Sequence, residues 1–458
     1  MTVSKFSLAN VKNIHMIGIG GSGMCPLAEI LRSKGYHITG SDCNESDTLE
    51  RIKSYGITVF MGHKAENINN ADVVVYSAAI KEDNPERIQA KKLGITLLER
   101  SEMLGLVCDK YADSVAVSGT HGKTTTTAML THILIGCQMN PSAIIGGKLP
   151  SIGGNSAVGT SDIMVVEACE YVDTFLHLHP SISVILNIDA DHLDYFKDLD
   201  HIKSSFRQFA MQTNRLLIIN GDDENSRDCL NDIDKEKLFY GFDEKNDYYV
   251  SDYQKESAFR QSFNLMKDGK ILHRITLNVP GKHNVLNALA SIVTALYLGA
   301  DIKAIAESIA KFTGVHRRFE LLGEFNGITV ADDFAHHPTE ITATLTSAMN
   351  MGFKKVWCVF QPHTFSRTFM LLDDFAKALS IPDKVIISEI LPVRETNIYN
   401  IYAEDLCAKI DGSIYRKTFD EITDYVCENA ESGDLILTMG GGNVYMCANQ
   451  IVRKLQSK

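Results

Sequence analysis

Short apolar runs alternate with amphipathic stretches along roughly the first 110 residues. The apolar runs at 13–19, 37–42 and 71–77 have the length and the content of branched residues that buried β-strands have. Between them, one stretch that ends at Lys34 and another over Leu49–Tyr55 repeat apolar positions at helical spacing. This alternation predicts βαβ units and a parallel sheet.

A second alternation begins at residue 114 and predicts another α/β domain. Its expected strands lie at 114–119, 163–168, 183–188 and 215–220. Further on, residues 263–279 form two β-rich runs on either side of Asp268-Gly269, the strongest short signal for a hairpin. The sheet of this domain is therefore expected to be mixed.

A pair of helices over 283–312 precedes a third alternation, with strands expected at 327–333, 356–362, 384–390 and 434–442. At 458 residues, the chain exceeds the usual size of one hydrophobic core, and about three domains of roughly 150 residues are expected. The predicted fold is α/β with three domains, Rossmann-like at both ends and resembling a P-loop ATPase in the middle. The expected limits are 1–110, 111–313 and 314–458.

Charge and composition exclude several classes of protein. A net charge of -12 argues against a general nucleic-acid binder, because phosphate backbones are held by clustered Lys and Arg. The ten cysteines include no CxxC pair, which is typical of a reducing compartment. No run approaches the roughly 18–20 apolar residues of a membrane span, and the N-terminus lacks a signal-peptide core. A cytoplasmic protein without membrane insertion is expected.

The first glycine-rich loop lies at residues 18–23, directly after the first expected strand. Gly18, Gly20 and Gly23 satisfy the G-x-G-x-x-G pattern, in which glycines allow a diphosphate to approach backbone N–H groups at a helix N-terminus. Asp42 stands where a ribose-binding acid would follow. The residues alone leave open a nicotinamide-dependent dehydrogenase, another nucleoside-diphosphate site, or a tight turn without a ligand.

The second glycine-rich loop, GTHGKTTT at 119–126, lies between an expected strand and an expected helix. Backbone N–H groups of such a loop surround phosphates, Lys123 supplies a compact positive charge, and the Thr124 hydroxyl is suited to Mg²⁺. This loop predicts an ATP site. Two phosphate loops about 100 residues apart indicate two different phosphorylated ligands.

Candidate metal ligands follow two strands of the central domain. Glu167 and His192 come after strand ends, and ligands of open α/β sheets lie beyond the carboxyl ends of strands. Both are therefore expected to face the loop of Thr124. Three acids nearby are alternatives, with ordinary surface residues as the competing explanation: Glu170, Asp189 and Asp191.

Two further motifs lie at the start of the third domain. HRRFE at 316–320 contains two arginines, and DDFAHHPTE at 332–340 contains paired acids and paired histidines after a strand. An arginine near a phosphate site stabilises developing phosphoryl charge, and an Asp there acts on metal-bound water or orients an attacking group. A solvated loop or a helix cap is the alternative for either motif.

Eight motifs, in order from residue 18 to residue 368, carry a resemblance to the Mur ligases. They are GIGGSGM, GTHGKTTT, EACEY, NIDADHLDYF, GKHNVLNALA, HRRFE, DDFAHHPTE and QPHTFSRT. Within the family, the chain is most similar to the members that use ATP and Mg²⁺ to join L-alanine to UDP-N-acetylmuramate in peptidoglycan precursor synthesis. The resemblance implies that the first domain binds the UDP-sugar and not a nicotinamide cofactor.

The resemblance also implies a role for each matching residue. For the UDP-sugar these are Gly18, Gly20, Gly21, Gly23, His63, Ser77 and Arg100. For ATP they are Gly119, Thr120, His121, Gly122, Lys123, Thr124 and Thr125, with Asn284 and Asn287 for adenine. For the metal they are Thr124, Glu167 and His192. The catalytic set implied is Lys123, Glu167, His192, Arg318 and Asp333, and the residue implied for the amino acid is Arg367. His336 and His337 are the next candidates for the amino-acid site.

The chain departs from the family pattern at one motif. Many members read QPHRYTRT where this chain reads QPHTFSRT, so Thr364 replaces an arginine linked to the amino-acid carboxylate and Arg367 remains. Lys203 is near in sequence to a lysine that some members carbamylate, without a secure match. Two alternatives stay open: a ligase of the same family that recycles murein tripeptide, and a nucleotide-driven binding module. The sequence predicts no oligomeric state.

Overall fold

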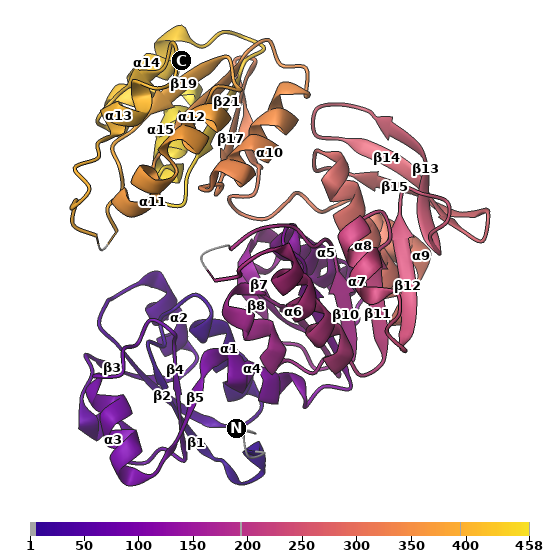
Figure 1. Ribbon diagram of the computed structural model, residues 1–458, viewed down its shortest axis with the longest axis vertical. Helices are drawn as coiled ribbons and strands as arrows, with labels where there is room; N and C mark the ends of the chain where they lie inside the picture. The colour runs from indigo at the N-terminus through magenta and orange to yellow at the C-terminus, as the bar shows by residue number, and fades with distance from the viewer. Residues whose placement is uncertain (1–5, 193–194, 394, 458) are drawn as a thin grey trace. The chain divides into compact units, whose positions relative to one another are not determined.

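The computed structural model describes residues 6–192, 195–393 and 395–457 (Figure 1). Within the first range, only the backbone of Asp47 is described. The chain forms two compact units. The first contains residues 1–254, 262–277 and 282–312, and the second contains residues 255–261, 278–281 and 313–458. Among the described residues, no helix is long and apolar enough to span a membrane.

The N-terminal part of the first unit is a parallel sheet of five strands in the order β3-β2-β1-β4-β5. Because the chain crosses to opposite sides of β1, the loop after β1 lies at the switch point where such sheets bind ligands. The strands are β1 (Asn13–Ile17), β2 (His37–Asp42), β3 (Thr58–Met61), β4 (Val73–Tyr76) and β5 (Thr96–Glu99). The helices are α1 (Met24–Ser33), α2 (Asp47–Ser54), α3 (Pro85–Leu93) and α4 (Arg100–Cys108), with 3-10 turns η1 (Leu8–Asn10) and η2 (Ala65–Ile68).

Local sequence determines where these helices begin and end. Ser46 caps α2 by accepting a hydrogen bond from the Leu49 N–H at 3.2 Å. Asn84 caps α3 in the same way, Pro85 occupies its first position, and Gly94 ends it in the left-handed conformation at φ 69°. These caps hold the helices that connect the strands of the parallel sheet.

The central part of the first unit is a sheet of ten strands in the order β15-β14-β13-β12-β11-β10-β6-β9-β7-β8. From β13 to β7 along this order, neighbouring strands run parallel, whereas β7 and β8 are antiparallel. The strands are β6 (Asp113–Ser118), β7 (Ser142–Leu149), β8 (Gly154–Ala157), β9 (Ile163–Glu167), β10 (Ile182–Ile185), β11 (Leu216–Asn220), β12 (Glu236–Gly241), β13 (Tyr248–Lys255), β14 (Gln261–Lys267) and β15 (Lys270–Leu277).

Helix α5 (Lys123–Gly136) lies at the centre of this part and packs against α8, α9 and β7. Apolar residues occur all round α5, which is typical of a helix covered on several sides. Between β14 and β15, Asp268 and Gly269 both adopt positive φ, at 50° and 71°, as the I′ hairpin turn requires. The remaining helices are η3 (Pro150–Ile152), η4 (Tyr171–His177), α6 (Leu199–Gln212), α7 (Glu224–Leu230), α8 (Lys282–Tyr297) and α9 (Ile302–Ile309).

The second unit is built on a sheet of six strands in the order β16-β17-β21-β18-β19-β20. β16 is antiparallel to β17, and the other neighbours are parallel. The strands are β16 (Glu320–Phe325), β17 (Ile328–Asp333), β18 (Val356–Phe360), β19 (Lys384–Ile387), β20 (Ile414–Tyr415) and β21 (Leu435–Met439). The helices are α10 (Pro338–Met349), α11 (Phe365–Met370), α12 (Leu372–Leu379), α13 (Ala403–Cys407), α14 (Phe419–Asn429) and α15 (Tyr445–Gln456).

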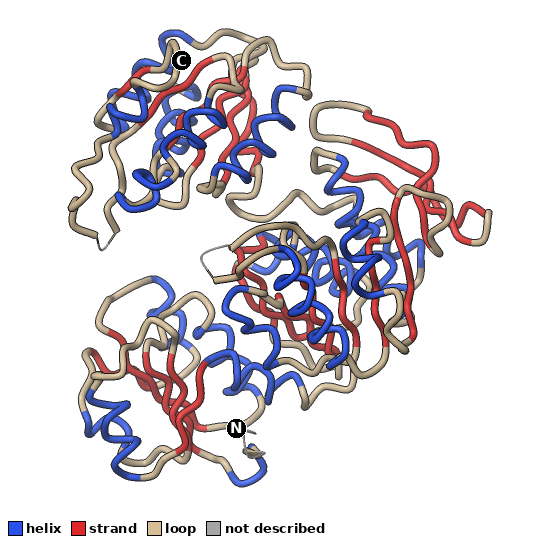
Figure 2. Tube along the Cα trace, in the orientation of Figure 1, coloured by secondary structure: helices blue, strands red, loops and turns tan. Residues whose placement is uncertain are grey.

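The predicted fold class is confirmed: each of the three sheets carries helices on its faces, and the central sheet is mixed (Figure 2). Two apolar cores, on opposite faces of the six-stranded sheet, account for its two layers of helices. The division of the chain at 312/313 falls beside the boundary expected at 313/314. The three domain limits themselves stay predictions.

Candidate active site

The loop at residues 119–122 joins β6 to α5 and depends on two glycines. Gly119 has φ 143° and Gly122 has φ 87°, conformations that residues with a Cβ rarely adopt. Space is equally restrictive, because a Cβ at Gly119 would lie 2.9 Å from Leu186 Cβ, and one at Gly122 would lie 2.6 Å from Asn287 Oδ1. The first N–H groups of α5 have no partner inside the helix, so the loop offers an anion site.

Lys123, the first residue of α5, bends back over the loop. Its Nζ donates to the carbonyl oxygens of Gly119 at 2.6 Å and Thr120 at 3.0 Å, and it pairs with Glu170 Oε2 at 2.8 Å. Burial acts to lower the pKa of Lys123, but Glu170, Cys169 and Glu167 together outweigh it and hold that pKa above its ordinary value. Lys123 is therefore charged at neutral pH, with Glu170 as its counter-ion.

Thr124 and Glu167 lie in direct contact. The Thr124 hydroxyl donates to Glu167 Oε1 at 3.0 Å, and the N–H of Gly146 on β7 donates to Glu167 Oε2 at 2.8 Å. A Cβ at Gly146 would lie 2.4 Å from that same oxygen, so glycine is needed for the carboxylate to approach. Strands β7 and β9 thus aim Glu167 at the start of α5.

His192 lies near Glu170 as well. Its Nε2 is 3.8 Å from Glu170 Oε1, and its ring lies 4.7 Å from the ring of Tyr171, centroid to centroid. Sequence analysis named Glu170 as an alternative to Glu167; in the structure Glu170, only 2% exposed, joins Lys123 to His192, while Glu167 joins Thr124 to β7. Within the described residues, no three His, Cys, Asp or Glu side chains group closely enough to hold a metal ion by themselves.

The other residues predicted for ATP surround the same loop. Thr120 accepts a hydrogen bond from the Asp189 N–H at 2.9 Å, and His121 Nε2 lies 3.8 Å from Asp189 Oδ2. Thr125 lies in the first turn of α5. On α8, Asn287 Nδ2 donates to Asn284 Oδ1 at 3.1 Å, and Asn287 is the neighbour that restricts Gly122. The fold therefore brings the two asparagines against the phosphate loop.

The first glycine-rich loop lies at the switch point between β1 and α1. Gly18 has φ 76°, and a Cβ at Gly20 would lie 2.3 Å from Leu49 Cδ1. The carboxylate of Asp42 accepts hydrogen bonds from the N–H of Gly20 at 3.0 Å and from those of Cys43 and Asn44. Asp42, which a dehydrogenase would use for a ribose, thus holds the loop itself together.

Three residues predicted for the UDP-sugar lie along the carboxyl edge of this sheet. Arg100, which begins α4, is 3.2 Å from the place where a Cβ of Gly23 would stand, and Ser77 lies beside Gly18. A Cβ at Gly21 would lie 3.3 Å from the Gly18 carbonyl oxygen, so this turn too is tight. His63, just past β3, contacts Ser41 Oγ at 3.0 Å through Nδ1. The sheet therefore gathers residues from 18 to 100 at one edge.

Sequence analysis missed a buried carboxylate beside His63. Glu86 on α3 is fully buried and accepts hydrogen bonds from Ser41 Oγ and Asn67 Nδ2, both at 2.6 Å, and it lies 3.1 Å from His63 Nδ1. Burial acts to raise the pKa of Glu86, but these donors and the nearby His15 lower it. The pattern of α3 gave no signal, because an acid just after Asn-Pro is typical of an exposed first turn.

In the second unit, the two arginines of HRRFE have different surroundings. Arg317 is buried: it pairs with Asp332 Oδ2 at 2.8 Å and donates to the carbonyl oxygens of Gly442 and Gly440 at 2.7 and 2.6 Å. Arg318 is half-buried, with its guanidinium carbon 5.7 Å from the ring centre of Phe334. The two arginines thus differ: Arg317 is held by an ion pair and two carbonyl oxygens, whereas Arg318 is half-buried beside an aromatic ring.

Asp333 ends β17 with its carboxylate enclosed. Its oxygens accept hydrogen bonds from the N–H groups of Phe319 and Ala335, both at 2.7 Å. Burial raises the pKa of Asp333 to about 6, although Arg318 and the two N–H groups act to lower it. Asp333 is therefore poised to change charge just below neutral pH.

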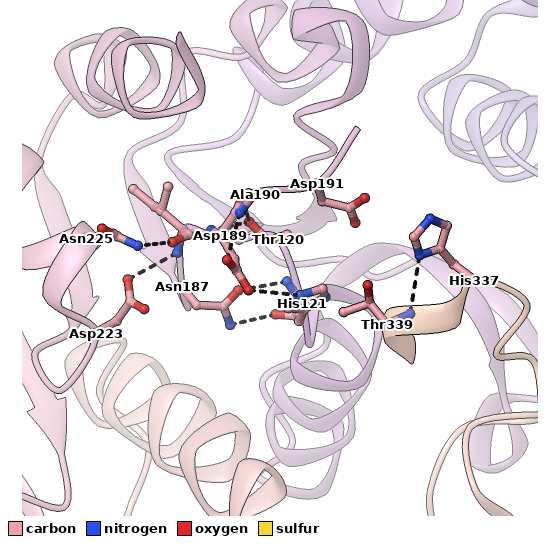
Figure 3. Close-up of polar contacts among 12 residues, drawn as sticks. Thr120, His121, Asn187, Asp189, Ala190, Asp191, Asp223, Asn225, His337 and Thr339 are labelled. Carbon is pink, nitrogen blue, oxygen red and sulfur yellow. Dashed lines mark hydrogen bonds and ion pairs between the residues drawn. The ribbon is translucent and has the colours of Figure 1, made fainter. Parts of the chain in front are cut away.

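The residues predicted for the amino acid divide into two groups. The ring centroids of His336 and His363 lie 6.0 Å apart, and Arg367 Nη1 lies 3.4 Å from His363 Nδ1, so these three form one cluster. Burial lowers the pKa of both histidines, so Arg367 supplies the positive charge of the cluster. His337 instead caps α10, where its Nδ1 accepts from the Thr339 N–H at 3.4 Å (Figure 3). His363 was missed as a candidate, although QPHTFSRT contains it.

Thr364, at the departure from the family pattern, is the N-cap residue of α11. It adopts φ 67° and its hydroxyl accepts a hydrogen bond from the Arg367 N–H at 3.4 Å. A threonine at this position therefore has a capping role that the usual arginine lacks.

Comparison with known proteins gives matches along nearly the whole chain. Three family models match: "Mur ligase family, catalytic domain" at residues 13–112, "Mur ligase middle domain" at 117–295 and "Mur ligase, glutamate ligase domain" at 317–442. The UDP-N-acetylmuramate--L-alanine ligase of Alkaliphilus metalliredigens is 45% identical over 96% of this chain and 97% of its own. The enzyme of the same name from Acetivibrio thermocellus is 45% identical over 97% and 96%.

Solved structures are similar over the same length. The UDP-N-acetylmuramate-alanine ligase MurC from Thermotoga maritima is 29% identical, with a TM-score of 0.79 over 98% of this chain and all of its own. The murein peptide ligase from Psychrobacter arcticus is 25% identical, with a TM-score of 0.70 over 98% and 99%.

Proposed function

Because the chain belongs to the Mur ligase family, we propose that it joins L-alanine to the lactyl carboxylate of UDP-N-acetylmuramate and converts ATP to ADP and phosphate. The observation that carries this proposal is 45% identity, over nearly the full length of both chains, to relatives named for that reaction. The product is a precursor of peptidoglycan.

Two other functions receive less support. A ligase that recycles murein peptide has the same fold, but the solved example is less similar, with 25% identity and a TM-score of 0.70 against 29% and 0.79. A nucleotide-driven binding module needs a phosphate loop but no group that stabilises a second, reacting carboxylate. The half-buried Arg318 and the enclosed Asp333 favour a ligase over such a module.

Each ligand is assigned to one part of the chain. Residues 1–110 hold the UDP-sugar at the glycine-rich loop 18–23, with Ser77, Arg100 and His63 along the same edge. Residues 111–313 hold ATP at the loop 119–125, with Asn284 and Asn287 for adenine. Residues 314–458 hold alanine through Arg367 and His336. His337 takes part less directly, because its ring nitrogen already caps α10.

A Mg²⁺ ion fits the residues at the start of α5. A hydroxyl and a carboxylate, those of Thr124 and Glu167, lie 3.0 Å apart, and both are oxygen ligands of the kind that Mg²⁺ prefers. With few protein ligands at hand, phosphate oxygens and water would complete the coordination, which is usual for this ion. When bound, Mg²⁺ neutralises negative charge on the phosphates. His192 is the third residue proposed for the metal, and its Nε2 lies 3.8 Å from Glu170 Oε1.

The chain's own residues account for the chemistry that a carboxylate requires. The lactyl carboxylate attacks the γ-phosphorus of ATP, which yields an acyl phosphate and ADP; the alanine amine then displaces phosphate. Lys123 and Arg318 offset negative charge that develops on the phosphoryl oxygens. The Arg367 guanidinium binds the alanine carboxylate through paired hydrogen bonds. The Asp333 carboxylate accepts hydrogen bonds from the N–H groups of Phe319 and Ala335 and so orients the backbone next to Arg318.

The reaction takes place in the cytoplasm under this proposal. None of the ten cysteines, all within the described residues, forms a disulfide, as is typical of a reducing compartment.

Phosphate release tests the proposal when UDP-N-acetylmuramate is supplied with each of the twenty amino acids in turn. Release should require both the UDP-sugar and an amino acid, alanine should be preferred, and mass spectrometry should find the amide product. ATP hydrolysis that proceeds equally well without the two acceptors, with no amide formed, would contradict the ligase assignment.

A further inference from the structure

One side chain of the loop after β10, that of Asn187, forms hydrogen bonds with both backbone polar groups of His121 in the phosphate loop. Asn187 Oδ1 accepts the His121 N–H at 2.8 Å, and Asn187 Nδ2 donates to the His121 carbonyl oxygen at 3.0 Å (Figure 3). In addition, the Thr120 N–H donates to the Asn187 carbonyl oxygen at 3.0 Å. The two ends of the amide thus pair with the two polar groups of one backbone residue.

This pairing restrains the peptide planes before and after His121. The bond to the His121 N–H fixes the 120–121 peptide, and the bond to its carbonyl fixes the 121–122 peptide. Gly122, at φ 87°, follows directly and leads into α5, so it has no side chain to restrain the chain there. The direction of the N–H groups that meet phosphate therefore depends on a side chain outside the loop.

The other end of this contact is anchored on a helix. The N–H of Ile188 donates to Asp223 Oδ2 at 3.1 Å, and Asn225 Nδ2 donates to the Ile188 carbonyl oxygen at 2.9 Å. Asp223 is also the cap of α7, where it accepts the Ser226 N–H at 2.9 Å. Asn187 thus connects a glycine-rich loop to a rigid element.

We propose that Asn187 is a positioning residue for the nucleotide: it holds the 120–122 peptides in the orientation that binds the ATP phosphates, without touching ATP itself. This inference rests on the proposed use of ATP. It predicts that the loss of the amide weakens nucleotide binding and leaves binding of the other two substrates unchanged.

The test is calorimetric titration of the full-length Asn187→Ala protein with the magnesium complex of a non-hydrolysable ATP analogue. The Kd should rise about tenfold, since two hydrogen bonds that organise the loop are lost. In steady-state assays, KM for ATP should rise by a similar factor, with KM for UDP-N-acetylmuramate and for alanine unchanged. Asn214→Ala is the matched control, because it removes an amide-to-carbonyl hydrogen bond of the same kind, to His179 at 3.0 Å, at the opposite end of β10 from the phosphate loop; its Kd should stay within about twofold of wild type.

Thermal unfolding without ligand separates loop orientation from general stability, and the two variants should unfold at similar temperatures. If Asn187→Ala does not fold, Asn187→Asp is titrated in its place; it keeps the oxygen that accepts from His121 and loses the bond to the His121 carbonyl, so a rise in Kd is again expected. An unchanged Kd, or an equal rise in Asn214→Ala, overturns the role of Asn187. Failure of the wild-type protein to bind the analogue overturns the proposed function instead.

Discussion

Adjacent arginines in HRRFE differ because of what encloses each. Arg317 satisfies a buried carboxylate, that of Asp332, which is 1% exposed, and two carbonyl oxygens of the glycine turn after β21. Arg318 is half-buried, with its guanidinium carbon 5.7 Å from the ring centre of Phe334, and its charge acts to lower the pKa of Asp333. The sequence could not distinguish the two arginines, because adjacent residues of the same type differ only in the direction in which the fold points their side chains.

Substitution by alanine should therefore affect a different property at each arginine: the free energy of unfolding for Arg317 and the rate of catalysis for Arg318. Arg317→Ala leaves Asp332 buried without its partner, which typically costs about 3–5 kcal/mol of the free energy of unfolding. Arg318→Ala should unfold near the wild-type midpoint but lose about 100-fold or more in kcat/KM, as expected for a group that stabilises phosphoryl charge. Urea unfolding and steady-state kinetics on both variants check this. Wild-type stability in Arg317→Ala, or wild-type turnover in Arg318→Ala, would show that the roles are assigned wrongly.

The raised pKa of Asp333 predicts a pH dependence of stability. Burial raises this pKa to about 6 in the folded protein, whereas an unfolded Asp titrates near about 3.9. The folded state therefore binds more protons between these values, so the wild type should lose stability relative to Asp333→Asn as pH rises from about 4 to about 6, by on the order of 2 kcal/mol, and no further above that.

Unfolding of the two metal-free proteins by urea across this pH range is the measurement. Other titrating groups cancel in the difference between the curves. A difference that stays constant, or one that favours the wild type more as pH rises, would mean that Asp333 is not held in a desolvated state.

At the scale of elements, the hairpin of β7 and β8 is a part of the site that sequence analysis did not predict. Its glycines, Gly146 and Gly147, and its Pro-Ser turn are typical of a loop. The structure shows that β7 pairs with β9 and that its Gly146 N–H holds Glu167. A strand recruited by a neighbour distant in sequence gives little local signal, because its stability comes from the pairing.

Gly146→Ala tests whether β7 positions the carboxylate for the metal. The added Cβ would lie 2.4 Å from Glu167 Oε2 and displace it, so the Mg²⁺ concentration needed for half-maximal activity should rise by about tenfold or more, as loss of a supporting contact typically causes. Gly269→Ala is the control in the same sheet. It strains a turn at φ 71° with nothing within 4 Å, and it should lower stability without a change in Mg²⁺ dependence. Equal Mg²⁺ dependence in both variants would remove Gly146 from the account.

For the whole molecule, the fold class and both glycine loops were predictable, because strand–glycine–helix order is a local property. The contacts between loops were not. Three of these contacts join residues far apart in the sequence. The separation is 23 residues for Glu86 and His63, 47 for Glu170 and Lys123, and 66 for Asn187 and His121. NIDADHLD showed that something functional followed β10, but only the fold reveals that Asn187 faces the phosphate loop while His192 faces Glu170.

If the lactyl carboxylate accepts the γ-phosphoryl group of ATP before the alanine amine attacks, one carboxylate oxygen must pass to phosphate. The most direct measurement uses UDP-N-acetylmuramate with ¹⁸O in both lactyl carboxylate oxygens, together with ATP and alanine. The carboxylate oxygen that attacks phosphorus stays on phosphorus when the amine displaces it, so each amide formed should release one phosphate that carries one ¹⁸O. Amide formation with unlabelled phosphate, or with the label in AMP and release of diphosphate, would contradict the account.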